Sequence, residues 1–253
     1  PDPRCRPLGA TGTARSGQPD IAGIPGTINM NHNDHISASW DTNADLWTRA
    51  VRQDLIPSRR AGTDQAIVDA VMALKPQRVV DIGCGEGWLI RQLGCDGVGV
   101  DGSAALIEAA QSADAAGHYF ALTYEDLVAQ PDKLAGPYDV AIFNFSLLGE
   151  DISDILRAAR VSVSPSVSGG AVLIQTLHPW AARGEGGYRN GWRHETFSSF
   201  ASGEWQPMPW YYRTLETWCG EVEDAGLKLK AIHEPMHKTN GEPLSVIFHC
   251  AEI

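Results

Sequence analysis

Apolar positions along the chain follow two different periods. From Trp40 to Leu55 and from Thr63 to Leu74 they recur every three or four residues, which predicts two helices, and Pro76 ends the second. After Pro76, short apolar runs alternate with further helical segments. Strands are predicted over residues 78–82, 97–100, 118–122, 138–144, 170–177, 227–233 and 244–251. Helices are predicted over residues 88–93, 103–112, 152–163 and 215–225.

Strands that alternate with helices predict a parallel sheet with helices on both faces. The last two strands are joined only by a short turn region, residues 238–242, which predicts an antiparallel pair at the end of the sheet. The expected fold is therefore α/β: a seven-stranded, mostly parallel sheet with an antiparallel C-terminal strand and helices on both faces.

Two segments depart from this pattern. Residues 1–29 are rich in Pro and Gly and poor in large apolar side chains, so they bury too little surface to offset their ordering entropy. We expect a flexible N-terminal extension there and a single domain over residues 30–253. Residues 179–209 form an insertion far longer than the ~2–6 residues of an ordinary strand–helix loop, which predicts a lid. Half of the chain's aromatic residues lie between His178 and Trp218.

Composition narrows the class of partner. The 253 residues include 20 Lys and Arg against 31 Asp and Glu, a formal net charge of −11. This charge argues against nucleic acid, because phosphate contacts need clustered cations. No apolar run approaches the ~18 residues of a membrane span, and no charged-then-apolar secretory signal is seen. A small molecule or a protein is the favoured substrate.

Cysteine and histidine usage bears on metals and on the compartment. The five cysteines form no C-x-x-C pair, which favours a reducing cytoplasm and argues against a disulfide framework or a zinc site. His32 and His35 lie three residues apart in an expected tail, which is poor support for a metal site. No metal is predicted.

The sequence Asp81-Ile-Gly-Cys-Gly-Glu-Gly87 lies between a predicted strand and a predicted helix. Glycines at such a turn let the backbone approach a ligand closely. The spacing differs from the dinucleotide fingerprint G-x-G-x-x-G, because Trp88 stands where the third glycine is due, and this argues against an NAD-dependent oxidoreductase. Asp81 suits a ligand with a cationic end. Asp101, which ends the next strand, has the place of an acid that accepts hydrogen bonds from ribose hydroxyls.

From Val79 to Leu177 these residues resemble the class I S-adenosylmethionine (SAM)-dependent methyltransferase family, of the small-molecule type. The resemblance rests on the Asp81–Gly87 motif, on Asp101, on the order of the strands and on the strand over residues 138–144. It implies a Rossmann-like fold, SAM as the cofactor, S-adenosylhomocysteine (SAH) as the product, and methyl transfer as the reaction.

The resemblance also implies a set of cofactor contacts. Asp101 would hold the ribose, and Thr123 and Tyr124 would meet the adenine. Glu125 or Asp126 is the alternative adenine contact, and a solvated helix start is the other interpretation of these two acids. The implied cofactor-binding residues are Asp81, Gly83, Cys84, Gly85, Asp101, Gly102, Ser103, Thr123, Tyr124, Glu125, Asn144, Phe145 and Trp47.

Further implied contacts come from outside the glycine loop. In the family, Asn144 and Phe145 occupy positions that face the SAM methionine and the substrate. The prolines of the Asn/Asp-Pro-Pro-aromatic sequence of DNA amino-methyltransferases are missing here, which argues against nucleic-acid amines. Trp40 and Trp47 resemble aromatic residues that cap the cofactor, with core packing as the equal alternative. Arg59-Arg60 is a candidate site for a substrate carboxylate, although exposed arginines often bind nothing specific.

The predicted lid supplies candidates for substrate contact and catalysis. The segment from Trp210 to Arg213 resembles one found in a subgroup of small-molecule methyltransferases. His178, at the carboxyl end of the fifth strand, is the candidate general base, and the alternative is a hydrogen-bonded histidine at the root of the lid. His194, Glu195 and Tyr188 are weaker candidates. The predicted substrate-binding residues are Tyr188, Trp192, Trp210, Tyr211 and Arg213; alternatively, most of these rings form a small core under the lid.

The leading hypothesis is a SAM-dependent methyltransferase that acts on a small molecule with an aromatic or apolar body. Two alternatives stay open. One is a protein or RNA methyltransferase, which would need a docking surface. The other is a protein that binds SAM without catalysis, because an intact cofactor loop does not separate binding from transfer.

Overall fold

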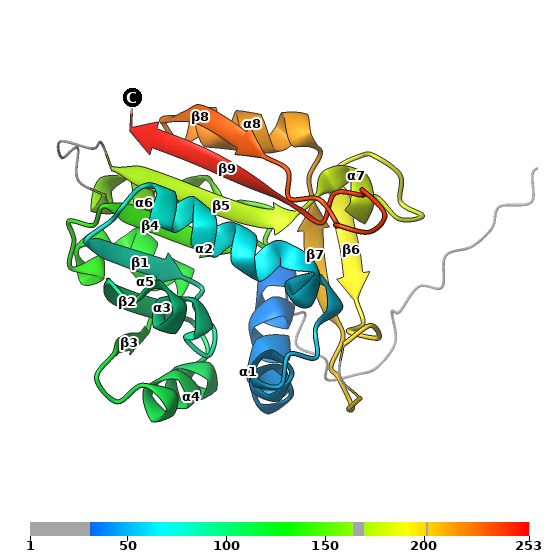
Figure 1. Ribbon diagram of the computed structural model, residues 1–253, viewed down its shortest axis with the longest axis horizontal. Coiled ribbons are helices and arrows are strands. Elements are labelled where there is room, and N and C mark those ends of the chain that lie inside the picture. The colour runs from blue at the N-terminus through cyan, green and yellow to red at the C-terminus, as the bar shows by residue number, and fades with distance from the viewer. Residues whose placement is uncertain (1–30, 164–169, 201, 253) are drawn as a thin grey trace, which may run out of the picture.

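The computed structural model of the chain describes residues 31–163, 170–200 and 202–252 (Figure 1). The extension expected over residues 1–29 lies outside these residues. The main sheet is 7-stranded, in the order β3-β2-β1-β4-β5-β9-β8. Its strands are β1 (Arg78–Ile82), β2 (Asp96–Asp101), β3 (His118–Ala121), β4 (Val140–Asn144), β5 (Ala171–Leu177), β8 (Leu227–His233) and β9 (Ser245–Glu252).

Strands β1 to β5 pair in parallel, and β9 runs antiparallel to both of its neighbours, β5 and β8. The expected Rossmann-like fold is confirmed. The strand order reverses at β1, which has β2 on one side and β4 on the other. In an open sheet of this kind, ligands bind in the crevice outside the carboxyl ends of the strands at such a switch point.

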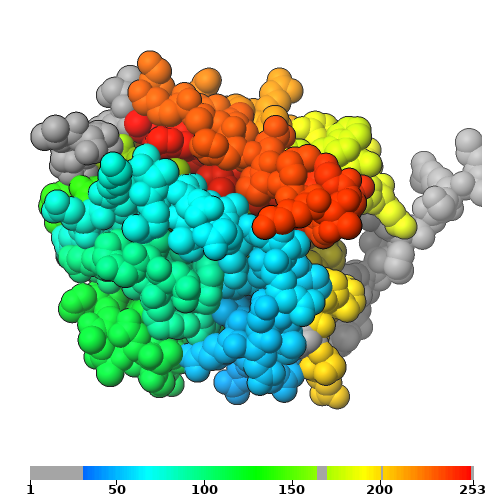
Figure 2. Space-filling model, viewed as in Figure 1, coloured from blue at the N-terminus to red at the C-terminus, as the bar shows by residue number. Residues whose placement is uncertain are grey.

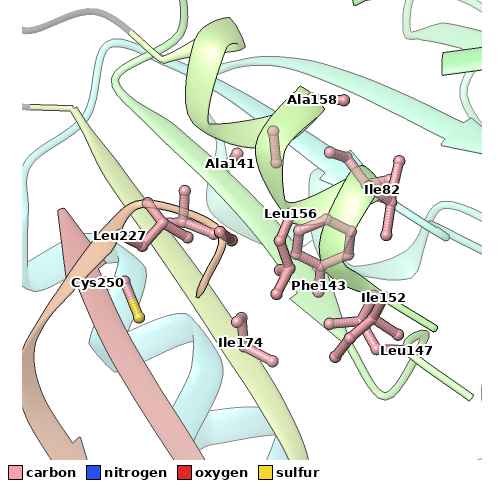
Figure 3. Packing of buried hydrophobic residues seen from close by; sticks show 14 of the residues in the cluster. Ile82, Ala141, Phe143, Leu147, Ile152, Leu156, Ala158, Ile174, Leu227 and Cys250 are labelled. Carbon is pink, nitrogen blue, oxygen red and sulfur yellow. The ribbon is translucent and has the colours of Figure 1, made fainter. Parts of the chain in front are cut away.

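Helices cover both faces of the sheet. They are α1 (His32–Arg52), η1 (Arg59–Thr63), α2 (Asp64–Ala73), α3 (Trp88–Leu93), α4 (Ala104–Ala113), α5 (Tyr124–Ala129), η2 (Pro131–Leu134), α6 (Ser153–Ser162), α7 (Pro179–Ala182) and α8 (Leu215–Asp224). On one face, Leu156 of α6 packs with Ile82 and Phe143 of the sheet (Figure 3). On the other, Ile67 and Leu89 of α2 and α3 belong to a second buried cluster. Full burial of one such side chain stabilises the fold by ~1.5–3 kcal/mol.

A small second sheet stands at the carboxyl ends of the parallel strands. It is the hairpin of β6 (Gly191–Glu195) and β7 (Met208–Tyr212), and α1 lies next to it (Figure 1). Helix α1 contacts both α4 and β7. In Figure 2 the blue atoms of α1 accordingly lie between the green half of the chain and the yellow hairpin. Helix α1 and the hairpin therefore enclose the end of the sheet where a ligand is expected.

Helix α1 begins earlier than its hydrophobic pattern indicates. The pattern predicts a start near Trp40, but the helix begins at His32, so the placement of His32 and His35 in a tail is wrong. The cause is a capping box. The side chain of Asn31 accepts from the N–H of Asp34, and the Asp34 carboxylate accepts from the N–H of Asn31. A polar first turn is thus stabilised by its cap and not by an apolar face.

The hairpin is not among the predicted elements. The sequence Gly-Trp-Arg-His-Glu of β6 has no buried residue and lacks the alternation that identifies a strand. The predicted lid, residues 179–209, contains α7, β6 and the first residues of β7. None of the helices in the described part of the chain is long and apolar enough to cross a membrane.

Candidate cofactor-binding and active site

The loop between β1 and α3 turns through three glycines in left-handed conformation. Gly83, Gly85 and Gly87 have φ angles of 82°, 56° and 78°, a region that strains any residue with a side chain. The N–H groups of Gly83 and Cys84 both donate to the carbonyl of Val100 on β2, at 2.8 and 3.0 Å. The loop is thereby fixed across the carboxyl ends of β1 and β2.

Replacement of Gly83 by alanine is expected to destabilise the protein by about 2–4 kcal/mol. A Cβ on Gly83 would lie 2.3 Å from the Cβ of Ser146, and the positive φ adds strain. Gly85→Ala is the matched control, because the nearest atom to its added Cβ is Nε1 of Trp47 at 3.4 Å. Thermal unfolding should show the larger loss in Gly83→Ala and partial recovery when Ser146→Gly is added. Equal losses in the two single variants would contradict the clash.

One pocket lies where the loop, α1 and the ends of β1 and β4 meet. It is lined by six of the predicted cofactor-binding residues: Trp47, Asp81, Gly83, Cys84, Gly85 and Asn144. Arg59, Glu86 and Trp88 also line it. Glu86 and Trp88 are not among the predicted residues, and Arg59 is predicted only as a site for a substrate carboxylate. For Glu86 and Trp88 the only sequence signal is their position, Glu86 within the glycine loop and Trp88 directly after it.

Asp81 is a buried carboxyl without a counter-charge in the described part of the chain. It is 1% exposed, and its Oδ1 has no hydrogen-bond partner among the described residues. Burial, together with the nearby Asp101, raises the pKa of the Asp81 carboxyl to about 8. A buried carboxylate of this kind is costly unless a cation meets it. The pocket therefore favours a ligand with a cationic hydrogen-bond donor.

The pocket also holds an unpaired donor and a second unpaired acceptor. Arg59 Nη2 is buried with no hydrogen-bond partner in the described part of the chain, and the same holds for Oδ1 of Asn144. The guanidinium of Arg59 lies 4.4 Å above the ring of Trp88, and its Nε lies 2.9 Å from Oδ1 of Asp64. One unused donor is thus held in the pocket. A ligand that carries both an ammonium and a carboxylate would satisfy these groups.

Glu86 is the charged centre of the glycine loop. Its side chain is 1% exposed. Nη2 of Arg91 donates to Oε1 and Oε2 at 2.7 and 2.8 Å, and Nε of Arg52 donates to Oε2 at 2.8 Å. Arg52 Nη2 also donates to the carbonyl of Ala109 on α4. The Glu86 carboxylate therefore joins the loop to α1 and α3, and Arg52 extends the contact to α4.

The Asp101 carboxylate accepts hydrogen bonds from the glycine loop and from its own turn. Its Oδ2 accepts from the N–H of Gly85 at 2.8 Å, and its Oδ1 accepts from the N–H of Ser103 at 2.9 Å. Burial raises the pKa of Asp101, and these two N–H groups act in the opposite direction. Gly102, between Asp101 and Ser103, is exposed, and the Oγ of Ser103 is buried without a partner among the described residues. The acid is held in one orientation with further lone pairs for hydroxyl donors.

The residues after β3 mostly serve the protein itself. Thr123 and Asp126 form the capping box of α5, and Asp126 also pairs with Lys133 at 3.1 Å. The Tyr124 hydroxyl donates to the carbonyl of Ser146. Glu125 is exposed, as the solvated interpretation expects. The side chains of Thr123, Tyr124 and Asp126 are thus engaged, so an adenine contact here is left to backbone groups and Glu125 and stays a prediction.

The loop after β4 is locked to its neighbours. Phe145 has a φ of 57°, and its N–H donates to the carbonyl of Gln175. The Ser146 hydroxyl donates to the carbonyl of Ile82 at the end of β1. Asn144, just before this turn, is thereby fixed at the pocket.

An aromatic layer lies between α1 and the hairpin loop. Trp47, which lines the pocket, contacts Trp40 edge-on, and Phe197 stacks on Trp205 at 4.9 Å between centroids. Asn43 accepts from the N–H of Gln206 and donates to its carbonyl, both at 2.9 Å. Trp47 thus lines the pocket and packs on neighbouring rings at once, and capping of the cofactor by Trp40 and Trp47 stays a prediction.

The predicted substrate-binding side chains lie on the hairpin and its flanks, outside the lining of this pocket. Trp192 stacks on His32 at 3.9 Å and contacts Tyr211, and Tyr188 contacts Tyr212. Trp210 contacts Tyr212 as well. Many of these rings therefore pack on each other. Tyr188 is still 44% exposed, and substrate contact by Tyr188, Trp192, Trp210 and Tyr211 stays a prediction.

Arg213 is enclosed by the protein. Its side chain has 0% exposure, its Nη2 donates to the carbonyls of Gly149 and Glu150 at 2.7 Å, and its guanidinium lies between the rings of Tyr211 and Trp218. Burial lowers the pKa of this guanidinium. Arg213 ties the hairpin to the loop after β4, and direct contact with substrate stays a prediction.

Both ring nitrogens of His178 are in use. Nδ1 accepts from the N–H of Trp180 and so caps α7, and Nε2 lies 2.8 Å from Oε1 of Glu234. Since Nδ1 accepts, Nε2 carries the proton and donates to the carboxylate. This geometry favours an anchor at the root of the lid, and a role as general base stays a prediction. His194 is exposed, and Oε1 of Glu195 accepts from the N–H of Phe197.

The reversed strand order, the glycine loop and Asp101 together define a Rossmann-like nucleotide-binding domain. A model of the methyltransferase domain family matches residues 58–232, more than half of the chain. The chain therefore belongs to this family, and the predicted class I SAM-dependent methyltransferase is confirmed. Among curated proteins, none matches the chain.

Solved structures share the fold at low sequence identity. The SAM-bound magnesium protoporphyrin IX methyltransferase of Synechocystis is 17% identical with a TM-score of 0.59, over 90% of this chain and 100% of that one. A Thermotoga maritima methyltransferase, described as a possible histamine N-methyltransferase, is 15% identical with a TM-score of 0.59, over 85% and 99%. A SAM-dependent methyltransferase of Mesorhizobium loti is 20% identical with a TM-score of 0.55, over 73% and 98%.

Proposed function

We propose that this SAM-dependent methyltransferase transfers the methyl group to a small-molecule acceptor with an aromatic or apolar body. One observation carries the assignment of the cofactor site. The pocket at the end of β1 holds an unpaired buried carboxyl oxygen, Oδ1 of Asp81, and an unpaired buried guanidinium nitrogen, Nη2 of Arg59. No contact among the described residues satisfies either atom, so the pocket is built for a zwitterion.

The residues of the site fit SAM part by part. The ammonium of its methionine would meet Asp81 and Oδ1 of Asn144, and the carboxylate would meet Arg59. Its ribose hydroxyls would be held by Asp101. When bound, SAM supplies a methyl group already activated on a sulfonium. The protein has to orient the two reactants and exclude water, and such alignment can remove ~7–11 kcal/mol from a barrier.

Three features favour a small acceptor. The formal net charge of −11 disfavours a polyanion. Trp47 and Trp88 line the pocket, and further aromatic rings pack beside Trp47, which supports an acceptor with an apolar body. Two structural neighbours carry small molecules in their descriptions, a magnesium porphyrin and histamine. In this proposal the segment 179–209 is the lid over that pocket.

The cofactor assignment is tested by calorimetric titration of the protein with SAM, SAH and NAD. We expect micromolar binding of SAM and SAH and none of NAD. Asp101→Ala should weaken SAH at least tenfold, because it removes a charged acceptor of ribose hydroxyls and releases Gly85 and Ser103. A folded protein that binds neither SAM nor SAH would overturn the assignment.

The acceptor class is tested separately. The protein is incubated with SAM and a panel of aromatic and apolar alcohols, amines, thiols and carboxylic acids, and mass spectrometry detects the added methyl group. Peptide and RNA pools are run in parallel. Methylation of a small molecule alone supports the proposal. Methylation confined to a pool, or no transfer by a protein that binds SAM, would replace it with one of the alternatives.

A further inference from the structure

The turn that carries Arg59 depends on contacts from outside. η1 is a short segment with a kink at Gly62, whose angles are non-helical, φ 140° and ψ −1°. It joins α2 directly at Thr63, without a side-chain cap. A short irregular turn is not positioned by a regular helical hydrogen-bond ladder, so its neighbours decide where Arg59 lies.

One such neighbour is a buried amide on the sheet. Gln175, on β5, is 1% exposed. Its Nε2 donates to the carbonyl of Thr63 at 3.1 Å and to the Oγ of Ser245 on β9 at 2.9 Å. Residue 63 is 112 positions away in the sequence. Gln175 thus ties the end of η1 to the middle of the main sheet, and neither the family motif nor the proposed contacts use it.

We infer that Gln175 is a positioning residue for the amino-acid tail of the cofactor. Through the carbonyl of Thr63 it fixes η1, and η1 fixes the Arg59 guanidinium that would meet the cofactor carboxylate. This rests on the proposed function of the pocket. If so, the preference of the pocket for ligands with a full amino-acid tail depends on Gln175, a residue outside the pocket lining.

The test compares two ligands in one protein. SAH carries the ammonium and the carboxylate, whereas 5′-methylthioadenosine has the adenosine and the sulfur without them. Calorimetric titration gives the ratio of the two dissociation constants. A general loosening of the fold weakens both ligands and leaves the ratio unchanged, so the ratio reports only on the tail.

Four variants decide the outcome. Arg59→Gln should lower the preference for SAH at least tenfold, because a charged hydrogen bond is lost. Gln175→Met, of similar volume, should lower it about fivefold to tenfold. Gln175→Asn keeps the amide but shortens its reach, so it should lower the preference as well. It is the substitute if the methionine variant fails to fold. Ser245→Ala is the matched control, because it removes only the β9 partner, and the preference should stay within twofold.

The possible results distinguish failure of the positioning role from failure of the Arg59 contact and from failure of the proposed function. An unchanged ratio in both Gln175 variants overturns the positioning role, and so does an equal shift in Ser245→Ala. An unchanged ratio in Arg59→Gln overturns the inference at its first step while the proposed function stands. If the folded wild-type protein binds neither ligand, the proposed function itself fails.

Discussion

Replacement of Asp81 by asparagine is expected to weaken SAM and SAH on the order of 100-fold, because a buried charged hydrogen bond is worth ~1.5–3 kcal/mol. The substitution keeps the shape of the side chain, removes the charge that would meet the ligand ammonium, and turns one carboxyl oxygen into an NH2 donor. Calorimetric titration at pH 7.5 measures the change. An affinity within threefold of wild type would show that Asp81 does not hold the cofactor.

The pH dependence of binding gives an independent check. The pKa of Asp81 is about 8 in the free protein, so at pH 6.5 the carboxyl is protonated before the cation arrives. Binding then has to release about one proton, and the affinity for SAH should increase as the pH rises from 6 towards 8. Titrations in buffers of different ionisation enthalpy count that proton. Asp81→Asn should bind weakly with no proton release near pH 6.5.

The same substitution is expected to stabilise the ligand-free protein. Between pH 3.8, the ordinary pKa, and about 8 the folded state keeps a proton that the unfolded state has lost. The wild-type fold therefore loses stability as the pH rises through this window. The asparagine side chain of the variant has no such titration. The free energy of unfolding of Asp81→Asn should exceed that of wild type by a few kcal/mol at pH 8 and by little at pH 4.

The sheet could be predicted because its strands are local signals. Apolar runs such as Val140–Asn144, bounded by turns and separated by helical segments, identify a parallel sheet without any tertiary information. The hairpin gave no such signal, because β6 is half exposed and its pairing with β7 depends on α1 and the loop after β4. The early start of α1 follows from a cap between Asn31 and Asp34, two polar residues outside the hydrophobic pattern.

The site residues likewise include some that could be predicted from the sequence and others that could not. The places of Asp81, Gly83 and Gly85 at the pocket could be predicted, because one strand–turn–helix motif holds them within a short segment. The role of Glu86 could not, because it depends on Arg52 of α1, 34 residues away. The packing of the hairpin side chains could not be predicted for a related reason. The sequence shows that Tyr211 and Arg213 are neighbours, but not that they pack against the loop after β4.

Replacement of Glu86 by glutamine is expected to destabilise the protein by about 3 kcal/mol, which lowers the melting temperature by roughly 6–12 °C. The amide would place donors against the donors of Arg91 and Arg52 and leave both cations without their partner. Arg52 is 40% exposed and keeps some water, so the loss lies at the lower end for a broken buried pair. Glu223→Gln, an exposed change of the same charge on α8, is the control and should leave the melting temperature within about 1 °C.

Asp81 and Glu86 separate two uses of a buried carboxylate in one pocket. Each is 1% exposed and each lines the pocket. Glu86 has two arginines, and its charge holds the loop to α1 and α3. Asp81 has none among the described residues, so its charge has no partner until a ligand arrives. Neutralising the two carboxylates should therefore shift the melting temperature at pH 8 in opposite directions, up for Asp81→Asn and down for Glu86→Gln. A fall in both would mean that Asp81 also serves the fold, and its assignment to the cofactor ammonium would lose its physical basis.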